Sequence, residues 1–274
     1  MGGSRAVIVV TGAGGMGSAI ARRIGSGSTV VLADVNQQLL AVEVEAMTGA
    51  GYDVVGRAVD VSQRESVDAL AADAAARGSV VAVVHTAGLS PVQAPVDAIL
   101  RVDLLGTALM LDAFGPVIGP GGAGVFISSM AGTMAPPNPE LDLQLATTPT
   151  SQLLELPALA SDAVADPATA YVVAKRANQV RVMAASLAWG RRGARVNTIS
   201  PGIISTPMGT SELDGPSGAF MQMMIANSGT GRVGTPEDIA SVVDFLLSRD
   251  AGYITGTDLL VDGGVVAALQ APSA

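Results

Sequence analysis

A tyrosine and a lysine four residues apart, Tyr171 and Lys175, are the side chains of this sequence best suited to proton chemistry. They lie near the start of a long helical pattern over residues 168–190, and residues four apart on a helix share one face. We therefore expect the phenol and the ammonium to point into one pocket. A free phenol has a pKa of about 10, too high for acid–base work near neutrality, and a nearby cation lowers it. The spacing alone is more often that of an amphipathic helix with a snorkelling lysine, so its meaning depends on the rest of the chain.

A glycine-rich segment after the first apolar run predicts a dinucleotide site. Residues 6–10 are apolar and β-branched, typical of a strand buried on both faces, and a helical pattern follows at 18–25. Between them stands Thr11-Gly12-Ala13-Gly14-Gly15-Met16-Gly17. Gly12, Gly14 and Gly17 match G-x-G-x-x-G, in which the first glycine turns tightly, the second admits the pyrophosphate and the third lets the helix pack on the strand. The phosphates are expected at the N-terminus of that helix.

A carboxylate after the second predicted strand, residues 29–33, favours NAD over NADP. Asp34 follows Gly14 by 20 residues, where an acidic side chain in such a site binds the adenosine ribose hydroxyls. Its charge repels the 2′-phosphate of NADP, and Val35 and Asn36 supply no cation to hold that phosphate. The alternative, a solvated loop aspartate, is weakened by the glycine motif that precedes it.

The alternation of strand and helix patterns predicts one α/β domain over residues 1–274, with a doubly wound parallel sheet of about seven strands. Further strands are expected at 53–58, 80–84, 124–128, 195–199 and 259–261. Helices are expected at 37–48, 62–77, 91–114 with a break near 106, 168–190 and from 236, with Ser62 and Thr235 as N-caps.

Ligands of such sheets bind outside the carboxyl ends of the strands, and small or polar residues stand at two of these ends. Ala87 and Gly88 follow the fourth strand and are small enough for an adenosine to lie against the backbone. Ser129 follows the fifth strand, and its hydroxyl can bind a substrate oxygen beside Tyr171. Turn chemistry is the alternative explanation for this serine.

Two segments depart from the regular pattern. Residues 133–168 contain prolines that forbid one long helix, with short helical pieces expected at 141–145 and 153–160. This insertion is expected to form either a pocket wall or an oligomer contact. Residues 207–230 are rich in methionine. They predict either a helix that packs its apolar side on the body or a mobile apolar lid over the substrate.

Composition excludes several classes of function. The net charge of −9 disfavours nucleic acid and anionic membranes as partners. The chain has no cysteine and one histidine, His85, so neither a thiolate nor a histidine-rich metal site is expected, and His85 is expected simply to end a strand. No apolar run is long enough to span a bilayer, which predicts a cytoplasmic protein without a membrane partner.

Taken together, these motifs resemble the short-chain dehydrogenase/reductase family over nearly the whole chain. The joint pattern comprises the glycine loop, Asp60-Val61, Ala87-Gly88, Ser129, Tyr171-x-x-x-Lys175 and Pro201-Gly202 with Thr206. The resemblance implies that Tyr171 is the general acid–base, that Lys175 binds the nicotinamide ribose and lowers the pKa of Tyr171, and that Ser129 orients the substrate oxygen.

The resemblance also implies further cofactor contacts and an assembly. Asp60 and Val61 are expected at the adenine, and Ile204 and Thr206 at the nicotinamide amide. With the loop, the strand-end residues and the tyrosine–lysine pair, the cofactor-binding set is Gly12, Gly14, Gly15, Met16, Gly17, Asp34, Asp60, Val61, Ala87, Gly88, Tyr171, Lys175, Pro201, Gly202, Ile204 and Thr206. Members of the family form homotetramers or homodimers through two long helices, and the same is expected here.

Three features differ from the family pattern. The glycine loop is one residue shorter than Thr-Gly-x-x-x-Gly-x-Gly, which leaves the roles of Gly14 and Gly15 open. Asp103 stands where the family often has an asparagine that helps hold a water linked to the lysine. By this resemblance Asp103 is expected to belong to the catalytic residues. The 42 positions from Ser129 to Tyr171 far exceed the usual spacing, and this insertion resembles that of bacterial 3α-hydroxysteroid dehydrogenase/carbonyl reductases.

The leading hypothesis is an NAD-dependent oxidoreductase that interconverts a secondary alcohol and a ketone on a bulky hydrophobic, steroid-like substrate. The apolar segment 207–230 and the insertion are the features that suggest a bulky hydrophobic substrate. One alternative is a reductase of 3-oxoacyl thioesters, which would need a basic patch for an acidic carrier, and only Arg191, Arg192 and Arg195 offer one. The other alternative is a dinucleotide-binding sensor or scaffold without turnover, for which Asp103 is the only support.

Overall fold

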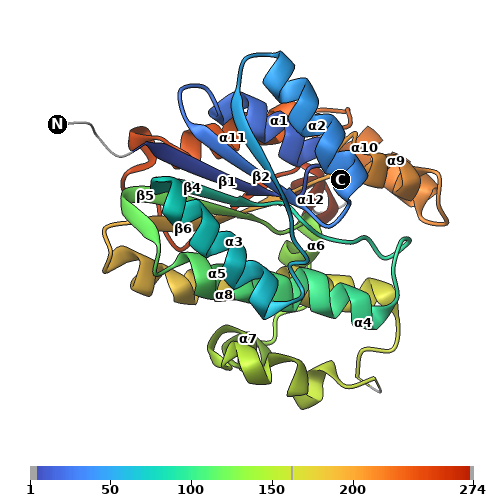
Figure 1. The fold of residues 1–274 in the computed structure, drawn as a ribbon. Coiled ribbons are helices and arrows are strands. Elements are labelled where there is room, and N and C mark those ends of the chain that lie inside the picture. Colours follow the sequence, from blue (N-terminus) through green and yellow to red (C-terminus); the bar gives the residue numbers. More distant parts are fainter. Residues whose placement is uncertain (1–4, 162, 272–274) are drawn as a thin grey trace.

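A parallel sheet forms the centre of the molecule. The computed structural model describes residues 5–161 and 163–271, and in that part the sheet has seven strands in the order β3-β2-β1-β4-β5-β6-β7 (Figure 1). The strands are β1 (Ala6–Thr11), β2 (Thr29–Asp34), β3 (Asp53–Ala58), β4 (Ser79–His85), β5 (Ile118–Ile127), β6 (Arg195–Pro201) and β7 (Asp258–Val261). The order reverses between β1 and β4, which makes the switch point of a doubly wound fold. The predicted single α/β domain is confirmed.

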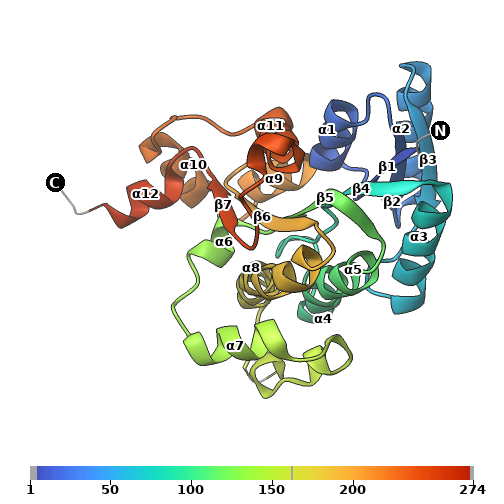
Figure 2. The same ribbon diagram turned by 90° about the vertical axis from the view of Figure 1, so that its left-hand side faces the viewer.

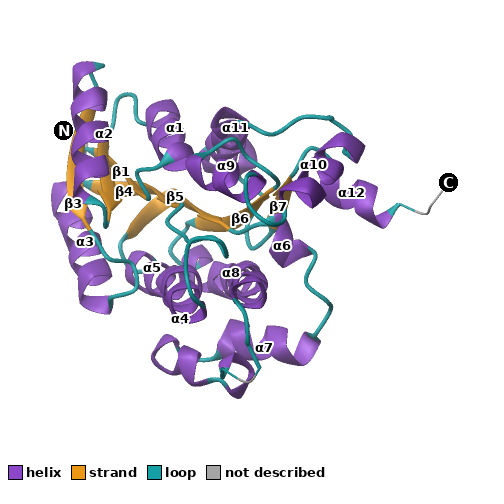
Figure 3. Cartoon of the chain, turned by 90° about the vertical axis from the view of Figure 1, so that its right-hand side faces the viewer, coloured by secondary structure: helices purple, strands orange, loops and turns teal. Residues whose placement is uncertain are grey.

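Helices cover both faces of the sheet, as Figure 3 shows. One face holds α1 (Gly15–Ile24), α2 (Gln37–Gly49) and α11 (Pro236–Leu247), whose Ile20, Leu40 and Val243 pack in one apolar cluster. The other face holds α3 (Arg64–Arg77), α5 (Gly106–Phe114) and α8 (Pro167–Gly190), whose Leu70, Met110 and Val182 belong to a second cluster. Burial on both faces explains why the strands read as continuous apolar runs.

The parallel register brings the carboxyl ends of the strands to one edge. Thr11 at the end of β1 pairs with Ala33 of β2 and with His85 of β4, and Ile127 of β5 pairs with Ile199 of β6. The loops after these strands therefore open on the same side, where the candidate site residues were expected.

Three predicted helix starts were wrong. The first helix begins at Gly15 rather than at residue 18. Ser62 does not cap α3, because its hydroxyl donates to Asp60 Oδ1 at 2.7 Å, and the helix begins at Arg64. The helix expected from residue 91 begins as α4 (Val96–Ile99) and continues through a π-helical stretch, η1 (Leu100–Leu105), into α5. A π-helix is wider than an α-helix and is frequent at functional sites. The Thr235 cap is confirmed, with a reciprocal bond to Asp238.

The described residues of the insertion, 133–161 and 163–168, form an outer layer (Figure 2). This layer packs on two long helical stretches: the first is η1 continued by α5, and the second is α8. Its elements are α7 (Pro139–Thr147) and two short 3₁₀ helices, η2 (Thr150–Glu155) and η3 (Pro157–Leu159). Leu145, Leu153 and Leu159 pack with Leu104 and Ala177 in a third apolar cluster. The insertion therefore covers the face through which the family resemblance predicted subunit contacts.

One buried arginine holds the insertion on α8. Arg181 is 8% exposed and donates from Nη1 to the carbonyl oxygens of Leu145 (2.8 Å) and Thr148 (3.0 Å) and from Nη2 to Thr150 Oγ1 (3.1 Å). These carbonyls end α7, and a helix leaves its last carbonyl groups without partners inside the helix. Arg181 thus donates hydrogen bonds to carbonyl groups that would otherwise be buried without a partner.

The methionine-rich segment, residues 207–230, contains α9 (Pro207–Leu213) and α10 (Gly218–Asn227). Met221 and Met224 of α10 are buried against Met130 and against Val265 of α12 (Val265–Gln270). For α10 the structure therefore has a helix packing its apolar side on the body. No helix among the described residues is both long and apolar enough to cross a membrane.

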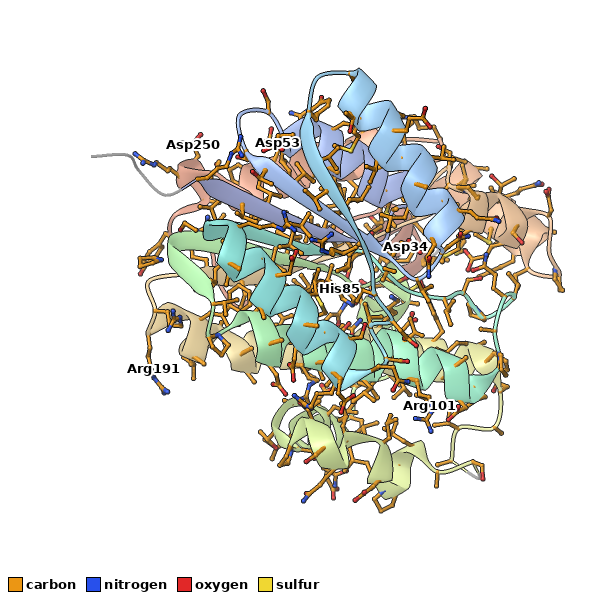
Figure 4. All side chains as sticks on the ribbon, in the orientation of Figure 1. Asp34, Asp53, His85, Arg101, Arg191 and Asp250 are labelled. Atoms are coloured by element: carbon orange, nitrogen blue, oxygen red, sulfur yellow. The ribbon has the colours of Figure 1, made fainter. Side chains whose placement is uncertain are left out.

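We predict that Arg181→Ala loosens the insertion. The change removes three hydrogen bonds and leaves buried carbonyl groups unpaired, so the free energy of unfolding should fall by about 2–4 kcal/mol. Urea denaturation followed by tryptophan fluorescence and limited proteolysis of residues 136–160 would measure both effects. Arg101→Ala is the control, because Arg101 pairs with Asp97 on the surface (Figure 4) and such pairs contribute about 0–1 kcal/mol. Equal stability of the two variants would contradict the anchoring role.

Candidate active site

A cleft of about 380 Å³ opens at the carboxyl ends of β1, β2 and β4. It is lined by ten residues that the sequence assigned to a cofactor, together with Thr206: Gly12, Gly14, Gly15, Met16, Gly17, Asp34, Asp60, Val61, Ala87 and Gly88. Pro201, Gly202 and Ile204 do not line this cleft. Gly202 and Ile204 border a second cavity, of about 210 Å³, with Asp262 and Gly263.

The structure assigns the roles of the loop glycines. Gly12 has φ +89°, a conformation that side chains disfavour, and a Cβ on Gly17 would overlap the carbonyl oxygen of Gly12. Gly14 precedes α1, and a Cβ there would meet no protein atom within 4 Å. A Cβ on Gly15 would meet Thr206 Cγ2 at 2.9 Å. Gly12 and Gly17 therefore permit the tight turn, Gly14 keeps the cleft open, and Gly15 lets the segment after β6 approach.

Asp34 is fixed at the rim of the cleft. Its Oδ2 accepts from the Ala13 N–H at 2.7 Å and its Oδ1 accepts from the Asn36 N–H at 2.8 Å. Two N–H donors fit the ionised carboxylate, and each oxygen keeps lone pairs for a further donor. The cleft thus offers a helix N-terminus with free backbone at one end and a carboxylate at the other, which fits the phosphates and the ribose of a dinucleotide.

The end of β5 is tied to the helix that carries Tyr171 and Lys175. Ser128 Oγ donates to the Lys175 carbonyl oxygen at 2.7 Å, and a Cβ on Gly132 would lie 2.7 Å from the Lys175 carbonyl carbon. This close approach puts Ser129, the N-cap of α6 (Met130–Thr133), near enough to Tyr171 for its hydroxyl to lower the pKa of the phenol. Lys175 Nζ lies 5.3 Å from the centre of the Tyr171 ring. The three predicted groups therefore meet.

Asp103 joins this group through a direct ion pair. Its Oδ2 lies 3.0 Å from Lys175 Nζ, and its Oδ1 accepts from the Leu89 N–H at 2.8 Å. The carboxylate side chain is fully buried, and the lysine side chain is 6% exposed. A Cβ on Gly88 would lie 3.2 Å from Lys175 Nζ, so a glycine there leaves room for the pair behind the cleft wall.

Burial and nearby charges shift the pKa values of Tyr171 and Lys175. Burial raises the pKa of Tyr171 above its ordinary value, and the nearby charge of Lys175 and the Ser129 hydroxyl offset this only in part. Lys175 thus lowers the pKa of Tyr171, as expected from the sequence, but burial outweighs it in the net shift. Burial acts to lower the pKa of Lys175, but the charge of Asp103 outweighs it, so the pKa is raised and the ammonium form persists.

His85 is confirmed as the last residue of β4. Its Nδ1 lies 2.6 Å from Thr11 Oγ1, and burial lowers its pKa to about 3, so the imidazole is neutral. Figure 4 places it in the interior of the molecule. The site therefore gains no charge from this side chain.

Sequence reasoning missed several residues of the site. Leu89, Gln93, Val102 and Met208 also line the cleft. Glu212 of α9 is close enough for its charge to act on Tyr171 and Lys175, and burial raises its own pKa. No sequence signal pointed to Glu212, since its distance in sequence from Tyr171 and Lys175 hides the contact.

Comparisons with known proteins agree with this geometry. Residues 6–140 match the family model described as short chain dehydrogenase, and residues 142–266 match that described as Enoyl-(Acyl carrier protein) reductase. Short-chain dehydrogenase/reductase bsc3 of Alternaria brassicicola is 44% identical over 97% of this chain and 98% of its own. D-threitol dehydrogenase of Mycolicibacterium smegmatis is 34% identical over 94% of this chain and 92% of its own. The 3-alpha-hydroxysteroid dehydrogenase/carbonyl reductase of Comamonas testosteroni is 29% identical, covering 89% and 98%.

Solved structures share the fold. A short-chain dehydrogenase/reductase from Serratia marcescens superposes with a TM-score of 0.74 at 23% identity, over 95% of this chain and 97% of that chain. A 7 alpha-hydroxysteroid dehydrogenase complexed with NADH superposes with a TM-score of 0.75 at 24% identity, over 95% and 93%. The chain belongs to the short-chain dehydrogenase/reductase family and is an oxidoreductase of that family.

Two alanine substitutions in the glycine loop should separate folding from binding. Gly14→Ala adds a methyl group to the open cleft, so the thermal midpoint should stay unchanged while NADH affinity, followed by fluorescence titration, falls at least about tenfold. Gly17→Ala forces the loop away from Gly12, so it should lower the thermal midpoint as well. Unchanged NADH affinity in Gly14→Ala would contradict the assignment of the cleft.

Proposed function

We propose that this chain is an NAD-dependent oxidoreductase that interconverts a secondary alcohol and a ketone on a bulky, largely hydrophobic substrate. The observation that carries the proposal is the convergence of Ser129, Tyr171 and Lys175 beside a cleft that fits a dinucleotide. A non-catalytic dinucleotide sensor has no need of this set, and the named relatives are dehydrogenases and reductases.

The chain's residues position the reacting oxygen and move its proton. A bound nicotinamide supplies the hydride acceptor in alcohol oxidation and the hydride donor in ketone reduction. Ser129 and the Tyr171 hydroxyl hold the substrate oxygen between them. In oxidation the phenolate of Tyr171 takes the hydroxyl proton as the carbon loses hydride, and in reduction the phenol returns a proton to the carbonyl oxygen as the carbon gains hydride. Lys175, beside Gly88, would hold the nicotinamide ribose of a bound cofactor.

NAD is proposed as the cofactor because of Asp34. Its carboxylate lies on the cleft rim, and the two residues that follow, Val35 and Asn36, carry no positive charge. A 2′-phosphate would meet the carboxylate without a compensating cation, whereas two ribose hydroxyls would find acceptors.

The substrate class rests on the walls of the site. The apolar segment 207–230 reaches the cofactor cleft through Met208, and relatives include a hydroxysteroid dehydrogenase/carbonyl reductase. Glu212 favours a second candidate, a polyhydroxylated alcohol, because a carboxylate close to Lys175 can accept from a further hydroxyl, and another relative is a threitol dehydrogenase. The thioester alternative loses support, since Arg195 is used internally on the carbonyl oxygens of Leu246 and Ser248.

A homodimer or homotetramer remains part of the proposal, with contacts different from those first expected. The insertion occupies the outer face of η1 and α8 with buried leucines. Subunits that used this face would have to displace a packed apolar layer, so we propose that they associate through other surfaces. A cytoplasmic location stays a prediction from the sequence.

Replacing Tyr171 with phenylalanine should abolish turnover and spare cofactor binding. NADH formation from NAD would be followed with hydroxysteroids, simple secondary alcohols, polyols and hydroxyacyl thioesters. For any substrate that the unmodified chain oxidises, Tyr171→Phe should lose about 10³-fold or more in kcat, since the proton acceptor is gone. NADH affinity should stay within about twofold. Tyr253→Phe, at a fully exposed tyrosine, is the control. Turnover retained by Tyr171→Phe would refute the mechanism.

Replacing Asp34 with asparagine should relax the cofactor preference. The substitution keeps the shape but removes the charge that a 2′-phosphate meets, so affinity for NADPH relative to NADH should rise about tenfold. Calorimetric titration of both cofactors would measure the ratio. Asp250→Asn, an exposed aspartate away from the cleft (Figure 4), should leave it unchanged. A preference for NADPH in the unmodified chain would overturn the assignment of NAD.

A further inference from the structure

The ion pair of Asp103 and Lys175 places two opposite charges directly behind the proton-transfer group. The side chains touch at 3.0 Å and are almost completely shielded from water. Charges buried in this way are costly unless paired and hydrogen-bonded. Asp103 has a second donor in the Leu89 N–H, and both of its donors fit the carboxylate form.

The π-helical stretch η1 makes this contact. Asp103 lies within η1, and its backbone carbonyl accepts from Thr107 Oγ1 at 2.9 Å. The side chain reaches across to α8, so the lysine contacts the carboxylate itself. An asparagine at this position would be neutral and would leave the ammonium without a balancing charge.

The other charged groups around Tyr171 and Lys175 do not provide that balance. From β4, His85 is neutral. From β5 and α6, Ser129 contributes a neutral hydroxyl. From α9, Glu212 acts on Lys175 through its charge, whereas Asp103 also touches the ammonium at 3.0 Å. Asp103 is therefore the carboxylate in direct contact with Lys175.

We propose that Asp103 is a positioning residue that neutralises Lys175 and thereby keeps the Tyr171 hydroxyl protonated at neutral pH, which suits the site to ketone reduction. The phenol is then ready to donate its proton to the carbonyl oxygen while hydride from the reduced dinucleotide reaches the carbonyl carbon. The carbon–oxygen double bond becomes a single bond, and the phenolate regains its proton from solvent. Oxidation needs the phenolate, so it should rise only at alkaline pH. The direction of proton transfer rests on the proposed function.

The ionisation itself can be measured without a substrate. The chain has three tyrosines, so the near-ultraviolet phenolate absorbance of Tyr171→Phe, subtracted from that of the unmodified chain, isolates Tyr171. Asp103→Asn keeps the shape and the Leu89 contact but removes the charge. We expect its Tyr171 midpoint to lie about one pH unit below that of the unmodified chain. The unmodified chain could unfold at alkaline pH before Tyr171 ionises. In that case, ionisation of Tyr171 seen in Asp103→Asn alone would also support the proposal.

Matched variants separate charge from structure. Asp97→Asn makes the same substitution at an exposed aspartate of α4 and should not move the midpoint. NADH binding and thermal midpoints would verify folding, and Asp103→Ser would replace Asp103→Asn if the latter does not fold. A midpoint that is unchanged or higher without the carboxylate would overturn the proposal, even where the enzyme turns over. With an active substrate, the alkaline limb of kcat/KM for oxidation should shift by the same amount.

Discussion

The buried charge of Lys175 is the constraint around which the active site is built. An ammonium with so little access to water is stable only with a carboxylate and a precise set of neighbours, and Asp103 provides the carboxylate at 3.0 Å. Gly88 must be small to leave room for the pair, and the Leu89 N–H must hold the other carboxylate oxygen. The pair thus couples the loop after β4 to two helices, and it sets the electrostatic environment in which Tyr171 exchanges its proton.

The parallel sheet supplies the rest of the geometry. Because every strand runs in the same direction, the loop after β1, the end of β2 and the loops after β4 and β5 meet at one edge. Close backbone contacts then refine their positions. Gly17 brings α1 onto the Gly12 turn, and Ser128 with Gly132 brings the end of β5 onto α8. The result is a dinucleotide cleft and a proton-transfer group side by side, each built from segments far apart in the chain.

The insertion shows how one added segment changes the surface available to partners. Its leucines bury apolar area on helices that would otherwise face outward, and Arg181 pairs with the carbonyl groups at the end of α7. Its apolar cluster also includes Tyr171 at its margin, so the insertion supports the catalytic helix from outside. The same residues therefore support the catalytic helix and cover its outer face.

The sequence by itself determined the doubly wound fold, the glycine loop, the position of Asp34 on the cleft and the identity of the tyrosine–lysine pair, because these depend on local periodicity and on spacings within one element. It placed Ser62 and the start of the helix before Asp103 wrongly, since turn bonds and a π-helical stretch compete with simple capping and periodicity. Only the tertiary structure decided that Asp103 contacts Lys175 directly, that burial outweighs the lysine at Tyr171, that Glu212 approaches the site and that the insertion covers the long helices. These outcomes depend on desolvation and on contacts between residues distant in sequence, which no local pattern encodes.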